Sequence, residues 1–274
     1  MRRPGVAAAA LAAVLVLASL AVPGLASPAA GPRPVSVVHR PPTATPAMPS
    51  LGTAPGTTLV ATTHGAIPGS TEPGAPPSLV VPGSWYGYPS ILPVIADAPG
   101  WVEVRLAQRP NGSVAWVPQS DVTLSSTPYA IVVNLATEHM SVYLDGQQIL
   151  DFPAGIGAPS EPTPPGQYFV TMQAPPPNAG YGPLVLVTSD HSDAIADWEG
   201  SGDAIIAIHG PITTLDDQLI GTTGAAISHG CIRLHNADLA QLANIPAGTP
   251  IDIIPGAPAT ASPSVEEAGL ILRP

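Results

Sequence analysis

Apolar residues in this chain occur in short runs or in strict alternation, and turn-forming residues separate the runs. Within residues 101–106, Val102, Val104 and Leu106 alternate with Trp, Glu and Arg, which is the pattern of a half-buried strand. Residues 204–208 are continuously apolar, as in a strand that is buried on both faces. Both patterns favour β-structure over long helices.

The same reasoning predicts strands along most of the chain after residue 90. One helix is expected over residues 237–243, with Asn236 as its N-cap. The fold class is therefore predicted to be all-β with a minor helix. The further predicted strands cover residues 91–95, 114–117, 129–135, 139–144, 166–172, 184–188 and 249–254, with a turn at Asp145-Gly146 leading into another.

The N-terminus has the features of an export signal. Arg2 and Arg3 precede an apolar run over residues 6–22, and small residues around Ala26 suit a signal peptidase. We expect residues 1–26 to be a signal peptide, and the alternative is an uncleaved signal anchor. Either interpretation predicts that the rest of the chain is exported and lies outside the cytoplasm, in the cell wall or a periplasm-like space.

Four further segments are distinguished by composition. Residues 27–77 are rich in Pro, Ala and Thr and are predicted to be a disordered linker. Residues 78–125 are expected to form a small β module, with a hairpin turn at residues 109–112 where Asn111 and Gly112 take positive φ. Residues 128–255 form the main domain, and residues 256–274 a C-terminal tail. The small module either binds the cell wall or is a spacer packed against the main domain.

The charge of the chain excludes some classes of partner. All eight basic residues are arginine, and the formal net charge is −11. Such an acidic chain should not bind nucleic acid or an anionic membrane through its overall charge. An anionic ligand would need local positive charge, for which Arg233 is a candidate.

Cys231 is the only cysteine, so the chain cannot form an internal disulfide. An unpaired thiol in an exported protein is either a small buried apolar residue or a reactive group. Composition alone does not decide between these interpretations.

Two segments carry the groups that would make the thiol reactive. His209 ends the apolar run over residues 204–208, and Cys231 lies in the segment Ser-His-Gly-Cys-Ile-Arg-Leu-His-Asn at 228–236. A histidine beside a cysteine supplies the base and the nucleophile of covalent acyl transfer. Nearby positive charge and a following helix would lower the pKa of the thiol. The amides of Gly230 and Cys231 could face a developing oxyanion.

Each of these residues also has a plainer interpretation. His209 could be a hydrogen-bonded core histidine, and Arg233 could simply pair with an acidic neighbour. His209, His229, Cys231 and His235 could together bind zinc, although the His229-Gly230-Cys231 spacing is unusual for that metal. His139 and His191 are expected at the surface.

The motif at 228–236, preceded by Ile-His-Gly at 208–210, resembles the signature of the L,D-transpeptidase catalytic domain of the YkuD type. Pro-Thr-Pro-Pro-Gly at 162–166 is similar to a further segment of that family. The resemblance covers residues 128–254 and implies a β-sandwich with a minor helix. The small module resembles an SH3-like β-barrel that precedes this domain in some high-GC Gram-positive proteins.

The resemblance implies a role for each matching residue. Cys231 would be the nucleophile that forms a thioester, and His209 the acid–base residue, oriented by the carbonyl of Gly210. The residues expected to line the oxyanion region or to position the loop are His229, Gly230, Ser228, Arg233 and Asn236. Residues 175–183 and 190–197 are where a cover over the donor site is expected.

The implied reaction belongs to peptidoglycan synthesis, and so to cell-wall biogenesis and cell shape. A donor tetrapeptide stem would acylate Cys231, and the side-chain amine of an acceptor stem would then give a 3→3 cross-link. No cofactor or metal is required, carbapenem β-lactams would be covalent inhibitors, and a monomer is expected. Two alternatives remain: an L,D-carboxypeptidase that trims stems, and a non-catalytic wall-binding scaffold.

Overall fold

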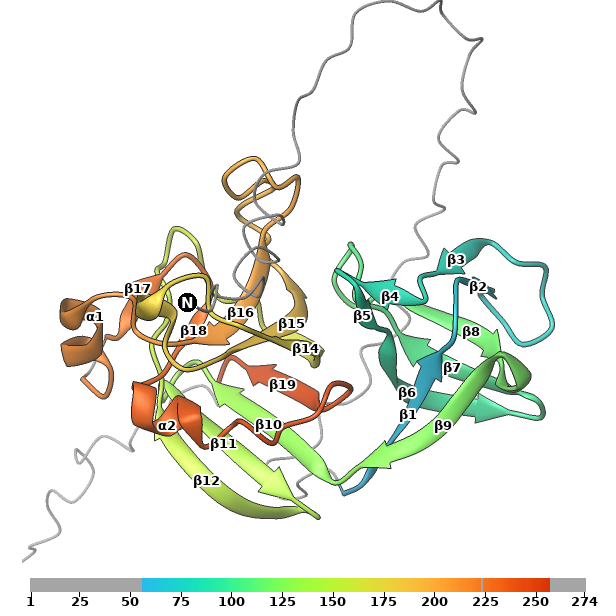
Figure 1. Ribbon diagram of the computed structural model, residues 1–274, viewed down its shortest axis with the longest axis horizontal. Helices are drawn as coiled ribbons and strands as arrows, with labels where there is room; N and C mark the ends of the chain where they lie inside the picture. The colour runs from blue at the N-terminus through green and yellow to red at the C-terminus, as the bar shows by residue number, and fades with distance from the viewer. Residues whose placement is uncertain (1–55, 223, 257–274) are drawn as a thin grey trace, which may run out of the picture.

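A computed structural model describes residues 56–222 and 224–256. The predicted signal peptide, residues 27–55 of the predicted linker and residues 257–274 of the tail lie outside this part of the chain. The described residues form two β-sheet lobes joined by one short connection between β9 and β10 (Figure 1). The all-β prediction is confirmed. In the described ranges, no helix has both the length and the apolar character needed to cross a membrane.

The N-terminal lobe is built on a five-stranded antiparallel sheet in the order β8-β7-β6-β1-β9. Its buried core includes Ala61, Val104 and Val117, none of which is exposed to solvent. The strands of the lobe are β1 (Thr58–Thr63), β2 (Ile67–Gly69), β3 (Leu79–Val81), β4 (Ser84–Trp85), β5 (Tyr88–Pro89), β6 (Ile91–Ala98), β7 (Trp101–Arg105), β8 (Val114–Pro118) and β9 (Val122–Thr127), with a short 3-10 turn, η2 (Gln119–Asp121), before β9.

The N-terminal boundary of this lobe differs from the prediction. Residues 58–77 were assigned to the linker, but β1 lies between β6 and β9, and β2 pairs with β3. The linker prediction is therefore wrong for these strands. Val60 and Ala61 of β1 are buried, so a short apolar segment between polar residues is enough to complete the sheet. The SH3-like identity of the lobe stays a prediction.

The C-terminal lobe is built on an eight-stranded sheet in the order β12-β11-β10-β19-β14-β15-β16-β18. β19 lies between β10, to which it is parallel, and β14, to which it is antiparallel. The strands are β10 (Tyr129–Asn134), β11 (His139–Leu144), β12 (Gln147–Pro153), β13 (Ile156–Gly157), β14 (Gly166–Ala174), β15 (Val185–His191), β16 (Ile205–His209), β17 (Ala226–Ser228), β18 (Ile232–Arg233) and β19 (Pro250–Ile254), and a 3-10 turn, η3 (Ala179–Tyr181), joins β14 to β15.

This lobe contains two short α-helices where one was predicted. α1 (Thr214–Leu219) begins with a capping box, in which Thr213 and Asp216 each accept a hydrogen bond from the other's backbone N–H. α2 (Asn236–Ala240) has His235 at the N-cap position and no side-chain cap, so the prediction of Asn236 as the N-cap is wrong. An added Cβ on Gly182 or Gly210 would lie within 2.6 Å of the Asn236 Oδ1 atom. Asn236 therefore packs against these two glycines.

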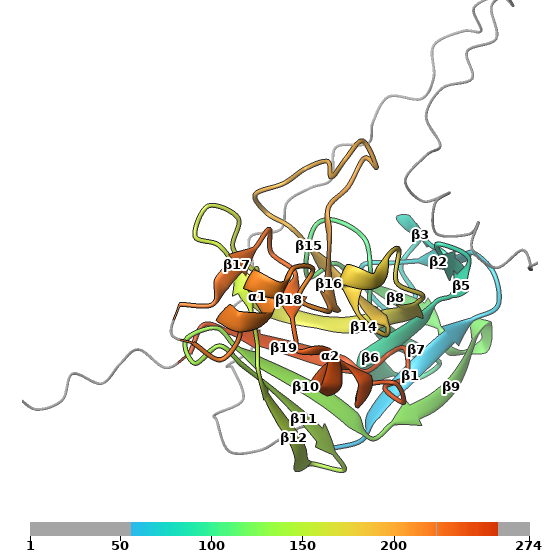
Figure 2. The same cartoon turned by 60° about the vertical axis from the view of Figure 1, so that its left-hand side comes forward.

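The two lobes share part of their packing. Phe169 of β14 is buried in the hydrophobic core of the N-terminal lobe, and β14 lies against β6 (Figure 2). Arg105 of β7 donates a 2.9 Å hydrogen bond to the side-chain oxygen of Gln167, also on β14. The N-terminal lobe thus packs against β14, which lies between β19 and β15 in the sheet of the other lobe.

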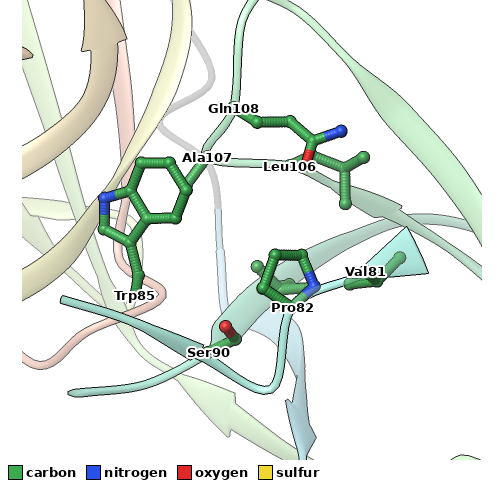
Figure 3. A pocket seen from close by; sticks show the side chains of 8 residues that line it. Val81, Pro82, Trp85, Ser90, Leu106, Ala107 and Gln108 are labelled. Carbon is green, nitrogen blue, oxygen red and sulfur yellow. The ribbon is translucent and has the colours of Figure 1, made fainter. Parts of the chain in front are cut away.

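A small cavity lies in the N-terminal lobe, between Trp85, Leu106 and Pro82 (Figure 3). Its volume is about 10 Å³, which is no more than a single water molecule needs. The indole Nε1 of Trp85 is buried and has no hydrogen-bond partner in the structure. The cavity is too small for a substrate.

Candidate active site

The pairing of β16 with β18 determines where His209 and Cys231 lie. The two strands are parallel, with Ile208 opposite Ile232 and His209 opposite Arg233. Side chains alternate between the faces of a sheet, so His209, Arg233 and Cys231 share one face, while Ile208 and Ile232 are buried on the other. Ideal strand geometry puts the Cα atoms of His209 and Cys231 about 8 Å apart on a diagonal. The predicted base and nucleophile are therefore neighbours.

These side chains open into a cavity of about 360 Å³. Both segments that were expected to cover the donor site contribute to its wall, through Tyr181 in one and Ser192 in the other. The wall also includes Tyr86 and Tyr88, which belong to the β4–β5 hairpin of the N-terminal lobe. The sequence did not predict that the N-terminal lobe contributes to the cavity. The strands β4 and β5 have only two residues each, and their sequence does not indicate which distant surface they face.

His209 is held in the tautomer that a general base requires. Its Nδ1 atom lies 2.7 Å from the carbonyl oxygen of Gly210, which can only accept a hydrogen bond. Nδ1 therefore carries the proton, and Nε2 of the neutral ring is free to accept one. Burial lowers the pKa of His209 to about 4, against a smaller opposing effect of the Gly210 carbonyl. The imidazole is thus neutral at pH 7.

The ring of Tyr181 packs against the imidazole of His209. The two ring centroids are 4.7 Å apart. The backbone of η3 is tied to the strand end, because the Gly210 N–H donates a 2.8 Å hydrogen bond to the Tyr181 carbonyl. Tyr181 is an aromatic side chain at a functional position that the sequence reasoning did not single out.

The pKa of the Cys231 thiol differs from the sequence prediction. Burial raises it above its ordinary value, although a backbone hydrogen bond from Ala207 and the charge of Arg233 act in the opposite direction. The prediction of a lowered pKa is wrong for two structural reasons. Cys231 precedes β18 and not a helix, and the Arg233 Nη1 atom is already paired with Asp216 Oδ2 at 2.9 Å. The resting Cys231 side chain is therefore a neutral thiol.

Ser228 organises the turn that carries the cysteine. Its hydroxyl donates a 2.5 Å hydrogen bond to the Cys231 carbonyl and accepts a 3.1 Å hydrogen bond from the Gly230 N–H. The Gly230 amide is therefore occupied, which leaves the Cys231 amide as the candidate for an oxyanion. Gly230 has φ +112°, and an added Cβ would meet Ile206 at 2.6 Å. Only glycine fits this position.

Thr163 supports the same turn from the opposite side. Its hydroxyl donates a 2.7 Å hydrogen bond to the Gly230 carbonyl and accepts a 2.9 Å hydrogen bond from the Gly157 N–H. The side chain is 2% exposed. Thr163 lies in the Pro-Thr-Pro-Pro-Gly segment, which the sequence analysis noted for its resemblance to the family. The sequence did not indicate that Thr163 contacts Gly230.

The remaining motif residues each have a separate partner. His229 contacts the carboxylate of Glu161, and its ring centroid lies 5.1 Å from that of Trp198. His235 Nδ1 lies 2.7 Å from an oxygen of Asp217. Within residues 56–222 and 224–256, no three His, Cys, Asp or Glu side chains are arranged to hold a metal ion. The imidazoles of His209, His229 and His235 each turn to a different partner. Arg233 pairs with Asp216, as its plainer interpretation predicted.

Comparison with known proteins connects this geometry to a family. The model of the L,D-transpeptidase catalytic domain, YkuD, matches residues 128–253. The YkuD protein of Bacillus licheniformis is 29% identical over 129 residues, which cover 47% of this chain and 67% of that protein. The YkuD protein of Bacillus subtilis is 27% identical over 127 residues, which cover 46% of this chain and 66% of that protein. The match thus spans about two thirds of the length of these relatives.

Solved structures of L,D-transpeptidases are also similar to part of this chain. An L,D-transpeptidase from Mycobacterium smegmatis is 20% identical, covers 58% of this chain and 79% of its own, and has a TM-score of 0.37. An L,D-transpeptidase in complex with imipenem is 19% identical, covers 72% of this chain and 82% of its own, and has a TM-score of 0.39. The assignment depends on the family match and on the motif residues that meet in the cavity. Residues 128–253 therefore match the L,D-transpeptidase catalytic domain family, YkuD.

Proposed function

We propose that this chain is an exported L,D-transpeptidase that cross-links peptidoglycan stems through a thioester on Cys231. The observation that carries the proposal is the meeting of a neutral imidazole, at the end of β16, and a thiol, at the residue directly before β18, in one cavity. His209 has its Nε2 atom available to take a proton, and Cys231 is the only thiol in the sequence.

In the first step, the Cys231 sulfur attacks the carbonyl carbon that precedes the terminal D-residue of a donor tetrapeptide stem. The thiol proton moves to Nε2 of His209, and the negative charge that develops on the carbonyl oxygen faces the Cys231 amide. Collapse of this adduct breaks the peptide bond. The departing amine takes the proton from His209, and the donor acyl group stays on sulfur as a thioester.

In the second step, the amine of an acceptor stem attacks the thioester carbonyl and gives a proton to His209. The carbon–sulfur bond breaks, the thiol is restored with that proton, and a 3→3 cross-link is formed. Because the thiol is neutral at rest and His209 has a pKa of about 4, each step needs a proton transfer that accompanies attack.

The test combines a covalent label with product analysis. After incubation with a carbapenem, the intact mass of the wild type should increase by one adduct, and Cys231→Ala should gain none. His139→Ala is the matched control for His209→Ala, because His139 is a partly exposed histidine on β11 paired with Asp151. We expect His139→Ala to be labelled like the wild type and His209→Ala to be labelled far more slowly.

Incubation with a tetrapeptide stem then separates transfer from trimming. A cross-linked dimer that forms when an acceptor amine is present supports the transpeptidase. Tripeptide as the only product, with and without the amine, would identify an L,D-carboxypeptidase instead. A wild type that neither accepts the carbapenem nor turns over the stem would contradict the enzyme proposal and favour the wall-binding scaffold.

A further inference from the structure

The loop over residues 192–204, which joins β15 to β16, forms one wall of the active-site cavity. Ser192, Ile195, Trp198 and Asp203 of this loop line it. The loop projects from the sheet as a long excursion between two adjacent strands (Figures 1 and 2). Its own hydrogen bonds are local, as in the 2.9 Å bond from the Trp198 N–H to the Asp203 carbonyl. Its position over the cavity must therefore be set from outside the loop.

Arg109 of the N-terminal lobe holds this loop at three points. Its Nε atom donates a 2.7 Å hydrogen bond to the Asp203 carboxylate. Its Nη2 atom donates to the carbonyls of Ser192, at 3.0 Å, and Ile195, at 3.2 Å. One guanidinium thus joins the first part of the loop to its end. The planar fork of arginine suits several acceptors at fixed angles, which the single ammonium of lysine cannot reproduce.

Residues next to Arg109 secure the strand end from which the loop leaves. Asn111 donates a 2.7 Å hydrogen bond to the His191 carbonyl and accepts a 2.9 Å hydrogen bond from the His191 N–H. The His191 ring lies 2.9 Å from the Ala107 carbonyl through Nε2 and 2.8 Å from Asp203 through Nδ1. His191 is 1% exposed, so the prediction that it lies at the surface is wrong.

This arrangement also corrects the predicted role of the turn at residues 109–112. Gly112 has φ +80°, as predicted, but Asn111 is absent from the residues with positive φ in the described chain. The side chain of Asn111 instead forms hydrogen bonds with the backbone of His191, at the end of β15. The turn is therefore shaped to meet the other lobe.

The contacts continue from the loop to the nucleophile. The Trp198 ring packs against His229, which is two residues before Cys231. Tyr86 and Tyr88 of the N-terminal lobe face the same cavity. We propose that the N-terminal lobe completes the acyl-donor site, and that Arg109 is the positioning residue that fixes the wall formed by residues 192–204. This inference rests on the proposed function for the identity of the donor, a peptide stem or a β-lactam.

Arg105 provides a matched control. It is also an arginine of the N-terminal lobe that contacts the other lobe, but its partner is Gln167 on β14, and neither residue lines the cavity. Loss of Arg105 therefore weakens the contact between lobes without touching the loop. Arg109→Lys keeps the charge and loses the fork, so it tests geometry separately from charge.

The first measurement is the second-order rate of acylation by a carbapenem, with the rate of alkylation by iodoacetamide beside it. A small displacement of a binding wall costs tenfold or more in rate, so we expect Arg109→Ala to lose about tenfold in acylation, Arg109→Lys an intermediate amount and Arg105→Ala less than about twofold. Alkylation by iodoacetamide does not require binding against residues 192–204. Its rate should therefore stay within about twofold of the wild-type rate in all three variants. Equal losses in Arg105→Ala and Arg109→Ala, or an unchanged Arg109→Ala, would overturn the inference.

The second measurement is amide hydrogen exchange over residues 192–204, which does not depend on activity. Arg109→Ala should exchange faster in this segment than Arg105→Ala, while residues of β10 and β11 keep the wild-type rate. If the wild type is not acylated, the proposed function fails but this measurement still applies. Wild-type protection of the loop in Arg109→Ala would show that the residue does not fix it. Should Arg109→Ala not fold, Arg109→Lys and Asp203→Asn test the same contact by both measurements.

Discussion

The hydroxyl of Thr163 donates a 2.7 Å hydrogen bond to the carbonyl oxygen of Gly230, the residue directly before Cys231. The same hydroxyl accepts a hydrogen bond from the Gly157 N–H, so one buried oxygen joins β13 to the turn that carries the thiol. Space is tight here as well, because an added Cβ on Gly157 would lie 2.4 Å from the Glu161 carbonyl oxygen. The position of the Cys231 turn is thus fixed by Thr163, which lies 67 residues before Gly230 in the chain.

Thr163→Val should destabilise the protein and slow acylation of Cys231. Valine has nearly the same shape but leaves a buried N–H and a buried C=O without their partner, at a cost of about 1–3 kcal/mol for each group. We expect the free energy of unfolding, measured with urea, to fall by about 2 kcal/mol or more. Thr163→Ser keeps the hydroxyl and should retain most of both stability and rate. Equal stability of the valine and serine variants would argue against this role of the hydrogen bonds.

Alkylation of Cys231 by iodoacetamide should increase with pH and should still be increasing above pH 9. Burial raises the pKa of the thiol above its ordinary value of 9.0, and the thiolate is the form that reacts. The rate is followed by intact mass across a pH series, with glutathione as the reference thiol. A plateau between pH 5 and 7 would mean that the thiolate is already formed at rest, which would favour an ion pair with His209.

Asp190→Asn should change the pH dependence of stability. Burial raises the pKa of the Asp190 carboxyl from 3.8 to about 8, against the opposing effects of Tyr168 and of the hydrogen bond from Asn111. Between these two pH values the folded state holds a proton that the unfolded state has lost, so the free energy of unfolding falls as the pH rises toward 8. Asparagine does not titrate and removes this dependence.

The Tm of Asp190→Asn, relative to wild type, should therefore be higher at pH 9 than at pH 5, by about 3 °C or more for a chain of this size. Asp97→Asn, which changes an exposed carboxyl on β6, is the control and should show no such trend. A Tm difference between Asp190→Asn and wild type that is constant from pH 5 to pH 9 would contradict the raised pKa.

The sequence predicted those parts of the structure that local pattern controls. Residues 204–208 contain no polar residue, and β16 indeed ends at His209 with Ile206 and Ile208 buried. The prediction of burial on both faces is only partly right, because Ile205 and Ala207 are half-buried and line the cavity. α1 was not predicted, because most of its residues are polar. Thr213 and Asp216, three residues apart, form a capping box, and this pair was a signal for the helix in the sequence. The pKa of Cys231 could not be predicted, because it depends on burial and on the partner of Arg233. The docking of Arg109 depends on a contact 94 residues away.

The position of β19 has a consequence for how the enzyme is made. Residues 250–254 form the strand that links β10 to β14, so they join the two halves of the catalytic sheet. A nascent chain that stops before Pro250 has two half-sheets with exposed edges, and such edges favour aggregation. Parallel pairing of β10 with β19 also brings together segments over 100 residues apart, which slows folding. The thiol can thus reach its final surroundings only after almost the whole catalytic domain has been synthesised.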